Sequence, residues 1–196
     1  MKIEGKTYTI PVDFLGITLG QYIAWYKSNS TIEQCAAALS CTTDEARKIK
    51  PSDMTVIVQA FDKVVNMQGA THRKVIKVQG TEYGFIPNID LMTAGEFVDL
   101  DAYNEQQVSG NYDALLSMAA ILYRPITRRL GNLYNITQYS VDTLEYQKSL
   151  EDLKHLPIAD LLGGLVFFCN IENDLLNNTL RSLMDLVNEL KTEVRN

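Results

Sequence analysis

Two stretches of this chain follow the same pattern, and their similarity constrains the fold more than any other sequence feature. The first reads KIEGKTYTIPVDFLGITLGQY from residue 2, and the second reads KVQGTEYGFIPNIDLMTAGEF from residue 77. Four pairs of residues match at a single offset: Gly5 and Gly80, Tyr8 and Tyr83, Thr18 and Thr93, Gly20 and Gly95. Pro11 and Pro87 match one residue out of step. Self-similarity of this kind predicts an internal duplication.

Each copy predicts a β-hairpin followed by a capped helix. Glu4–Gly5 and Gln79–Gly80 separate β-forming residues, and glycine tolerates the positive φ that a tight hairpin turn needs. The T-x-x-E/Q spacing of a capping box follows in both copies, at Thr18 with Gln21 and at Thr93 with Glu96. In such a box the two side chains satisfy backbone N–H groups at the helix start. The glycine at the second helical position of each copy is a poor helix former, which predicts that another backbone approaches closely there.

Most of the remaining chain is expected to be helical. Apolar spacing and start signals predict helices over residues 31–39, 43–50, 52–68, 112–123, 141–153, 157–170 and 172–194. The fold class is therefore α+β and helix-dominated, with small β-hairpins packed on a helical bundle. We expect two tandem hairpin-plus-helices units, 1–74 and 75–196, or one compact domain that contains both. The second unit carries an insertion at 124–140, expected to be a loop, and the C-terminal helix 172–194.

The composition fits a soluble globular protein. Of 196 residues, 46% are hydrophobic and 21% are charged. The longest apolar run, 161–169, would rise about 13 Å as a helix, less than half of a bilayer core. No apolar signal-peptide core follows the first residues. Three cysteines without a CxxC pair indicate a reducing cytoplasm.

The sequence predicts no catalytic, cofactor-binding or metal-binding residue. The two histidines, His72 and His155, lack the neighbours that zinc motifs require. Gly163–Gly164 sits in an apolar helix, where glycine more often permits close packing than phosphate binding. An enzyme would need Glu96 and Asp99 to form a cleft with shifted pKa values.

Nucleic acid is the alternative partner. Residues 32–50 follow the pattern of a helix-turn-helix. The net charge is −6, and Asp44 and Glu45 stand at the start of the second helix, where a DNA reader needs basic groups. We therefore expect no nucleic-acid binding, and a DNA-binding regulator remains an alternative.

The insertion after residue 122 carries the strongest indication of a binding surface. Arginine and tyrosine are enriched at the centres of protein interfaces. The candidate partner-binding residues are Tyr123, Arg124, Arg128, Arg129, Tyr134 and Tyr139. An alternative, equally weighted, is an ordinary loop whose tyrosines close over the core. Self-association through the leucine stripe of 172–194 is a further alternative to packing within the chain.

Three stretches carry a resemblance: EYGFIPNIDLMTAGEFVDLDAY, MAAILYRPI and GGLVFFCNIENDLLNNTL. Here the chain resembles a group of proteins from tailed bacteriophages, including crAss-like phages. The resemblance implies a virion-associated or assembly protein: a tail or connector component, an encapsidated cargo protein, or a tail assembly chaperone. Its partners would be other phage structural or assembly proteins. It would act in the host bacterial cytoplasm during assembly and could remain in the virion, in the tail or the capsid interior. The resemblance assigns no functional residue.

Overall fold

A computed structural model describes residues 2–3, 5–67, 69–87 and 92–169 of the chain. Helices predominate, and the main sheet has four antiparallel strands, so the predicted helix-dominated α+β class is confirmed. None of the described helices combines the length and apolar character that crossing a bilayer requires. The predicted helix over 172–194 lies outside the described residues.

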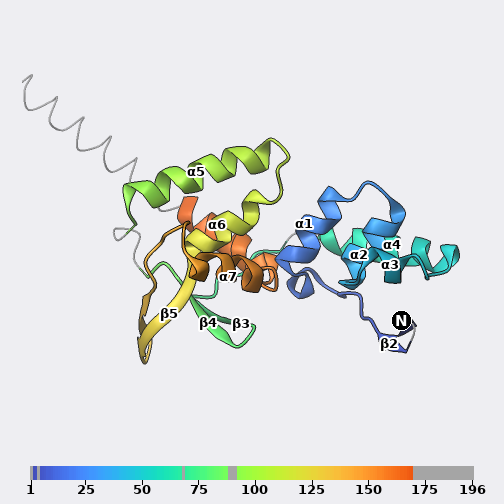
Figure 1. Ribbon diagram of the computed structural model, residues 1–196, viewed down its shortest axis with the longest axis horizontal. Coiled ribbons are helices and arrows are strands. Elements are labelled where there is room, and N and C mark those ends of the chain that lie inside the picture. Colours follow the sequence, from blue (N-terminus) through green and yellow to red (C-terminus); the bar gives the residue numbers. More distant parts are fainter. Residues whose placement is uncertain (1, 4, 68, 88–91, 170–196) are drawn as a thin grey trace, which may run out of the picture.

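The N-terminal half contains a short hairpin and a group of helices (Figure 1). Its elements are β1 (Lys2–Ile3), β2 (Lys6–Thr7), the 3-10 helix η1 (Phe14–Gly16), α1 (Leu19–Lys27), α2 (Thr31–Leu39), α3 (Thr43–Ala46) and α4 (Pro51–Val65). Proline at the first position of α4 suits a helix start, because the missing N–H would have no partner there. The predicted helix over 43–50 is shorter than expected, since α3 is a single turn.

The C-terminal half packs helices around the four-stranded sheet. Its elements are β3 (Val75–Val78), β4 (Thr81–Phe85), α5 (Ala94–Val108), α6 (Ala114–Leu122), β5 (Tyr123–Leu130), β6 (Leu133–Ile136), α7 (Leu144–Leu153) and a helix over residues 158–169. The strand order is β3-β4-β5-β6. The insertion after residue 122 is therefore a β-hairpin that extends the sheet, and our expectation of a loop is wrong.

The local features that the two copies share are present in both. Gly5 and Gly80 have positive φ, at 82° and 85°. Both predicted capping boxes form, with Thr18 Oγ1 and Thr93 Oγ1 each accepting from the backbone N–H three residues later at 3.2 Å. Residues within four positions of each other decide these turns and caps, which explains why the sequence predicts them well.

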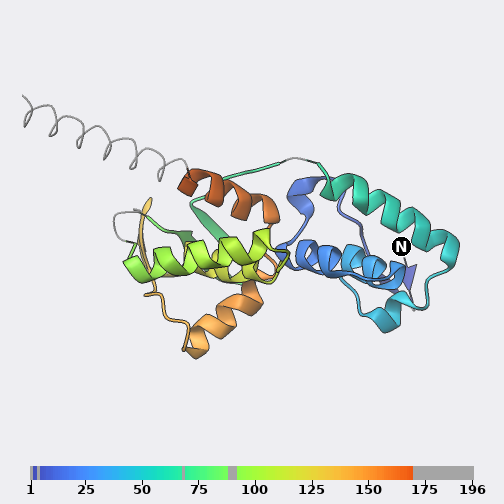
Figure 2. The same ribbon diagram turned by 90° about the horizontal axis from the view of Figure 1, so that it is seen from above.

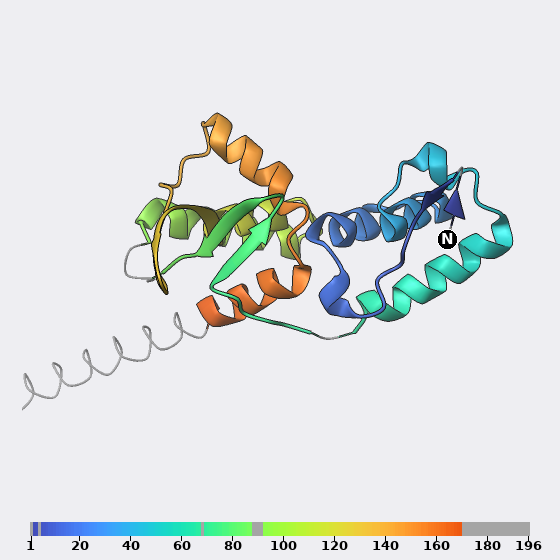
Figure 3. The same cartoon turned by 90° about the horizontal axis from the view of Figure 1, so that it is seen from below.

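The surroundings of the two copies differ, and the internal duplication is not confirmed. The β1–β2 hairpin stands apart from the main sheet, at the far end of the N-terminal half (Figure 3). The β3–β4 hairpin instead joins β5. The helices that follow differ as well, because α1 has 9 residues and α5 has 15.

The paired glycines illustrate the same difference. A Cβ on Gly20 would lie 3.0 Å from the Lys154 carbonyl oxygen, so the predicted close backbone approach is confirmed there. Among the described residues, the nearest atom to a Cβ on Gly95 is the neighbouring Thr93 Oγ1, at 3.9 Å. The expected close backbone approach is therefore not confirmed for Gly95.

Alanine substitutions at these two glycines should therefore change stability in opposite directions. We expect Gly20→Ala to lower the free energy of unfolding by about 1 kcal/mol, because the Lys154 backbone must move. Gly95→Ala should raise it by about 0.5–1 kcal/mol, since alanine costs less conformational entropy in a helix. Urea denaturation of both variants measures the difference, and equal effects at the two sites would contradict the packing described here.

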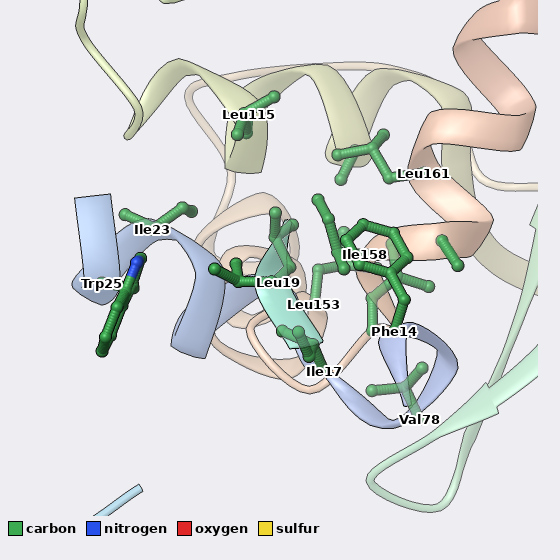
Figure 4. Close-up of a cluster of buried hydrophobic side chains, with 14 of the residues drawn as sticks. Phe14, Ile17, Leu19, Ile23, Trp25, Val78, Leu115, Leu153, Ile158 and Leu161 are labelled. Carbon is green, nitrogen blue, oxygen red and sulfur yellow. The ribbon is translucent and has the colours of Figure 1, made fainter. Parts of the chain in front are cut away.

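One continuous core joins the two halves (Figure 4). Ile17 and Leu19 are fully buried, as are Leu153 and Ile158 from the C-terminal half. The backbones meet as well: Leu19 N donates to the Leu156 carbonyl at 2.7 Å, and Ile158 N donates to the Ile17 carbonyl at 2.9 Å. Shared apolar burial and these hydrogen bonds stabilise the contact between the halves.

A second connection is formed by residues 69–74, which we call the crossing segment. It runs from the N-terminal helices to β3 alongside the 158–169 helix (Figure 2). Thr71 N donates to the Ala159 carbonyl at 2.9 Å. Gly163 makes this approach possible, because a Cβ there would lie only 2.0 Å from the Thr71 carbonyl oxygen. The expectation that Gly163–Gly164 permits close packing is confirmed, although the partner at Gly163 is an extended segment.

Candidate functional site

The candidate site is the β5–β6 hairpin, which holds five of the six proposed partner-binding residues. β5 follows α6 directly and pairs with β4 through its first residues, with Phe85 opposite Tyr123 and Tyr83 opposite Pro125. Its distal half pairs only with β6, and Leu130 lies opposite Leu133 at the turn. Gly131, at φ 61°, forms part of that turn. The hairpin tip projects from the body of the protein (Figure 1).

Tyr123 lies in the core rather than on the hairpin surface. Its side chain is fully buried, and its hydroxyl donates to the Arg73 carbonyl at 3.0 Å. Burial raises the pKa of the Tyr123 hydroxyl above its ordinary value, and the nearby Asp160 carboxylate adds to this shift. Tyr123 therefore links the sheet to the crossing segment.

Arg124 forms a buried ion pair with Glu96. The Nη1 and Oε1 atoms are 2.6 Å apart, and the two side chains are 10% and 3% exposed. The other Glu96 oxygen accepts from the Thr93 backbone N–H at 2.6 Å. The same carboxylate therefore caps α5 and pairs with Arg124 on β5. Burial lowers the pKa of the Arg124 guanidinium, while the Glu96 charge opposes this shift. Arg124 Nε is buried, and no described residue forms a hydrogen bond with it.

Tyr134 covers a glycine on the neighbouring strand β4. A Cβ on Gly84 would lie 2.4 Å from the Tyr134 ring. The Tyr134 hydroxyl lies 2.7 Å from the Phe85 carbonyl oxygen and 3.0 Å from that of Lys74. Burial raises the pKa of this hydroxyl. Tyr134 thus holds the hairpin against β4.

Tyr139, after the end of β6, contacts α5 and α7. Its hydroxyl donates to Asp99 Oδ2 at 2.9 Å, and its ring meets the Tyr146 ring at a centroid distance of 6.0 Å. Burial raises the pKa of Tyr139, and the hydrogen bond to Asp99 raises it further. Glu96 and Asp99, which an enzymatic role would have required in a cleft, each have a partner within the fold.

The two remaining candidates are exposed on the distal hairpin. Arg129 Nη1 lies 3.0 Å from Glu82 Oε1, and both side chains remain accessible to solvent. Arg128 is exposed on the same strand. Of the six residues predicted from sequence, only these two lie largely in solvent.

Sequence reasoning missed the two leucines at the tip. Leu130 is 77% exposed and Leu133 is 75% exposed. Because they face each other across the turn, their side chains lie close together on the hairpin. The signal was present in the sequence LGNL, in which a glycine-containing turn is flanked by apolar residues.

The helix-turn-helix alternative gains no geometric support. The helix that would read DNA, α3, is one turn long, and its first turn holds Asp44 and Glu45. Glu45 Oε1 pairs with Lys6 Nζ at 2.7 Å. A recognition helix must project several residues into the major groove, and α3 has four.

No protein-family model, curated protein or solved structure matches this chain. Within the described residues, no three His, Cys, Asp or Glu side chains are grouped so that they could hold a metal ion.

Proposed function

We propose that this protein is a non-enzymatic component of a tailed bacteriophage that acts by contacting other phage proteins. The resemblance of residues 82–103 and their neighbouring stretches to tailed-phage proteins supports the phage context. In this proposal the protein works in the host cytoplasm during assembly, as a tail or connector component, a packaged protein or an assembly chaperone.

The observation that carries this proposal is the apolar tip of a projecting hairpin. Single exposed apolar residues are common on protein surfaces. Here Leu130 and Leu133 are adjacent, stand on a projection and are flanked by Arg128 and Arg129. An apolar centre with arginine beside it is the composition of a protein interface. We define Leu130 and Leu133 with the two arginines as the hairpin tip.

Replacing both leucines with aspartate should remove partner binding and leave the fold intact. We expect the recovery of specific phage structural proteins with the tagged protein from infected cells to fall at least about tenfold, which corresponds to 1.4 kcal/mol or more. Leu144→Asp is the matched control, because Leu144 is 90% exposed at the first position of α7. Quantitative mass spectrometry measures recovery, and circular dichroism checks the fold.

If the Leu130→Asp/Leu133→Asp variant recovers the same phage proteins in the same amounts as the wild type, the hairpin tip is not the contact surface. Deleting residues 126–138 would be a weaker test, because it also removes Tyr134 from Gly84. Mass spectrometry of purified virions then distinguishes a structural or packaged protein from an assembly chaperone. A structural or packaged protein is present in the particle, and an assembly chaperone is absent from it.

A further inference from the structure

The crossing segment is held against the 158–169 helix by a small set of polar contacts. Besides the Thr71–Ala159 backbone bond, Thr71 Oγ1 donates to Asp160 Oδ1 at 3.1 Å. Arg73 Nε donates to the same oxygen at 2.8 Å, and Arg73 Nη2 pairs with Asp160 Oδ2. The Asp160 side chain is fully buried. These contacts fix the residues on either side of His72.

His72 itself lies between two aromatic rings. Its ring stacks on Phe167 at a centroid distance of 4.7 Å and an angle of 8°, and it meets the edge of Phe85 at 4.6 Å. Both ring nitrogens are buried, and none of the residues that the structure describes forms a hydrogen bond with them. In such a place a neutral imidazole leaves one donor and one acceptor without a hydrogen bond. An imidazolium would leave two charged donors without one, which costs more free energy.

The charged groups that face His72 come from two elements. Lys74, on the crossing segment, disfavours a second positive charge, and Asp160, on the 158–169 helix, favours one. The Asp160 carboxylate is already paired with Arg73. Phe85 on β4 and Phe167 on the helix contribute no charge. Burial is the largest influence and lowers the pKa of His72 below the ordinary 6.5.

We propose that His72 is an acid-sensitive latch: protonation of its ring releases the crossing segment from the 158–169 helix and uncovers the Phe85 side of the aromatic cluster. The core that joins the two halves remains, since the contacts of residues 17–20 with 154–158 do not involve the segment. The opening is local, and this inference does not depend on the proposed function.

Acid shifts the equilibrium of the crossing segment from the docked to the open state. His72 binds a proton more readily when the segment is open than when it is docked, so acid favours the open state. The docked state is most stable above pH 6.5. As the pH falls from 6.5 toward the pKa of the docked state, the opening constant should rise by up to about tenfold per pH unit.

Amide hydrogen exchange of the intact protein tests this directly. The Thr71 amide, which donates to Ala159, reports docking, and the Ile86 amide, which donates to the Leu122 carbonyl in the neighbouring sheet region, is the internal reference. Between pH 7.5 and 5, we expect the Thr71 protection factor to fall more than that of Ile86, by up to about tenfold for each pH unit below 6.5. His72→Phe keeps the stacked ring and should abolish this difference. His155→Gln removes the other imidazole, which is exposed, and should behave like the wild type.

Two results would contradict the proposed role of His72. One is a Thr71 protection factor with the same pH dependence in the wild type and in His72→Phe. The other comes from the wild type alone, so it remains informative even if the variant does not fold: an NMR titration in which the His72 ring protonates at pH 6.5 or above, without loss of Thr71 protection.

Discussion

Replacing Arg124 with alanine is expected to lower the free energy of unfolding by about 3–5 kcal/mol, because a buried carboxylate would lose its counter-ion. Glu96 is 3% exposed, and its Oε1 atom lies 2.6 Å from Arg124 Nη1. Chemical denaturation followed by circular dichroism measures the loss.

A second variant separates the cost of an unpaired charge from the net contribution of the pair. In Glu96→Gln/Arg124→Met neither of these two positions carries a charge, and glutamine can keep the capping box with Thr93. We expect this double variant to be more stable than Arg124→Ala, because isolated buried charges cost more than pairs contribute. Arg128→Ala, on the exposed part of the same strand, is the control and should change stability by less than about 0.5 kcal/mol. If Arg124→Ala is as mild as this control, the pair is not buried as described.

Replacing Gly163 with alanine is expected to lower the free energy of unfolding by about 3 kcal/mol, since the added methyl group meets backbone. The new Cβ would lie 2.0 Å from the Thr71 carbonyl oxygen and 2.9 Å from His72 N. Backbone cannot rotate away as a side chain can. The crossing segment must therefore move off the 158–169 helix and give up its bonds to Ala159 and Asp160.

Helix propensity would predict the opposite result at Gly163, because alanine is the better helix former by about 1 kcal/mol. Gly95→Ala is the matched control for that preference, since none of the described residues brings its backbone within 4 Å of a Cβ at Gly95. A stabilised Gly163→Ala variant with an unchanged Thr71 amide would show that the crossing segment does not dock at this glycine. A destabilised variant with lost Thr71 protection fits the structure.

The candidate site shows how residue composition can mislead. Arginines and tyrosines in the insertion suggested an interface, yet Tyr123 and Arg124 are buried and Tyr134 covers Gly84. The same properties that suit a side chain to an interface suit it to packing between strands and helices. Our alternative, in which tyrosines of the insertion close over the core, matches Tyr123, Tyr134 and Tyr139, although the segment is a hairpin and not a loop.

The sequence of the insertion does not predict a hairpin, because its local strand signals are weak. Pro125 lies within β5, and proline argues against a central strand. A β-bulge between Ile126 and Arg128 interrupts the alternation of residues in the strand. The pairing of β5 with β4 joins residues about forty positions apart along the chain, and no pattern within either segment specifies that pairing.

The turns, the capping boxes and the helix-dominated class can be read from the sequence, because they depend on residues within a few positions of one another. The difference between Gly20 and Gly95, the buried pair of Glu96 and Arg124 and the place of His72 between aromatic rings became visible only in the folded chain. Each of these depends on which distant segment packs against the residue, and burial sets the cost of every charge and every unpaired polar atom there.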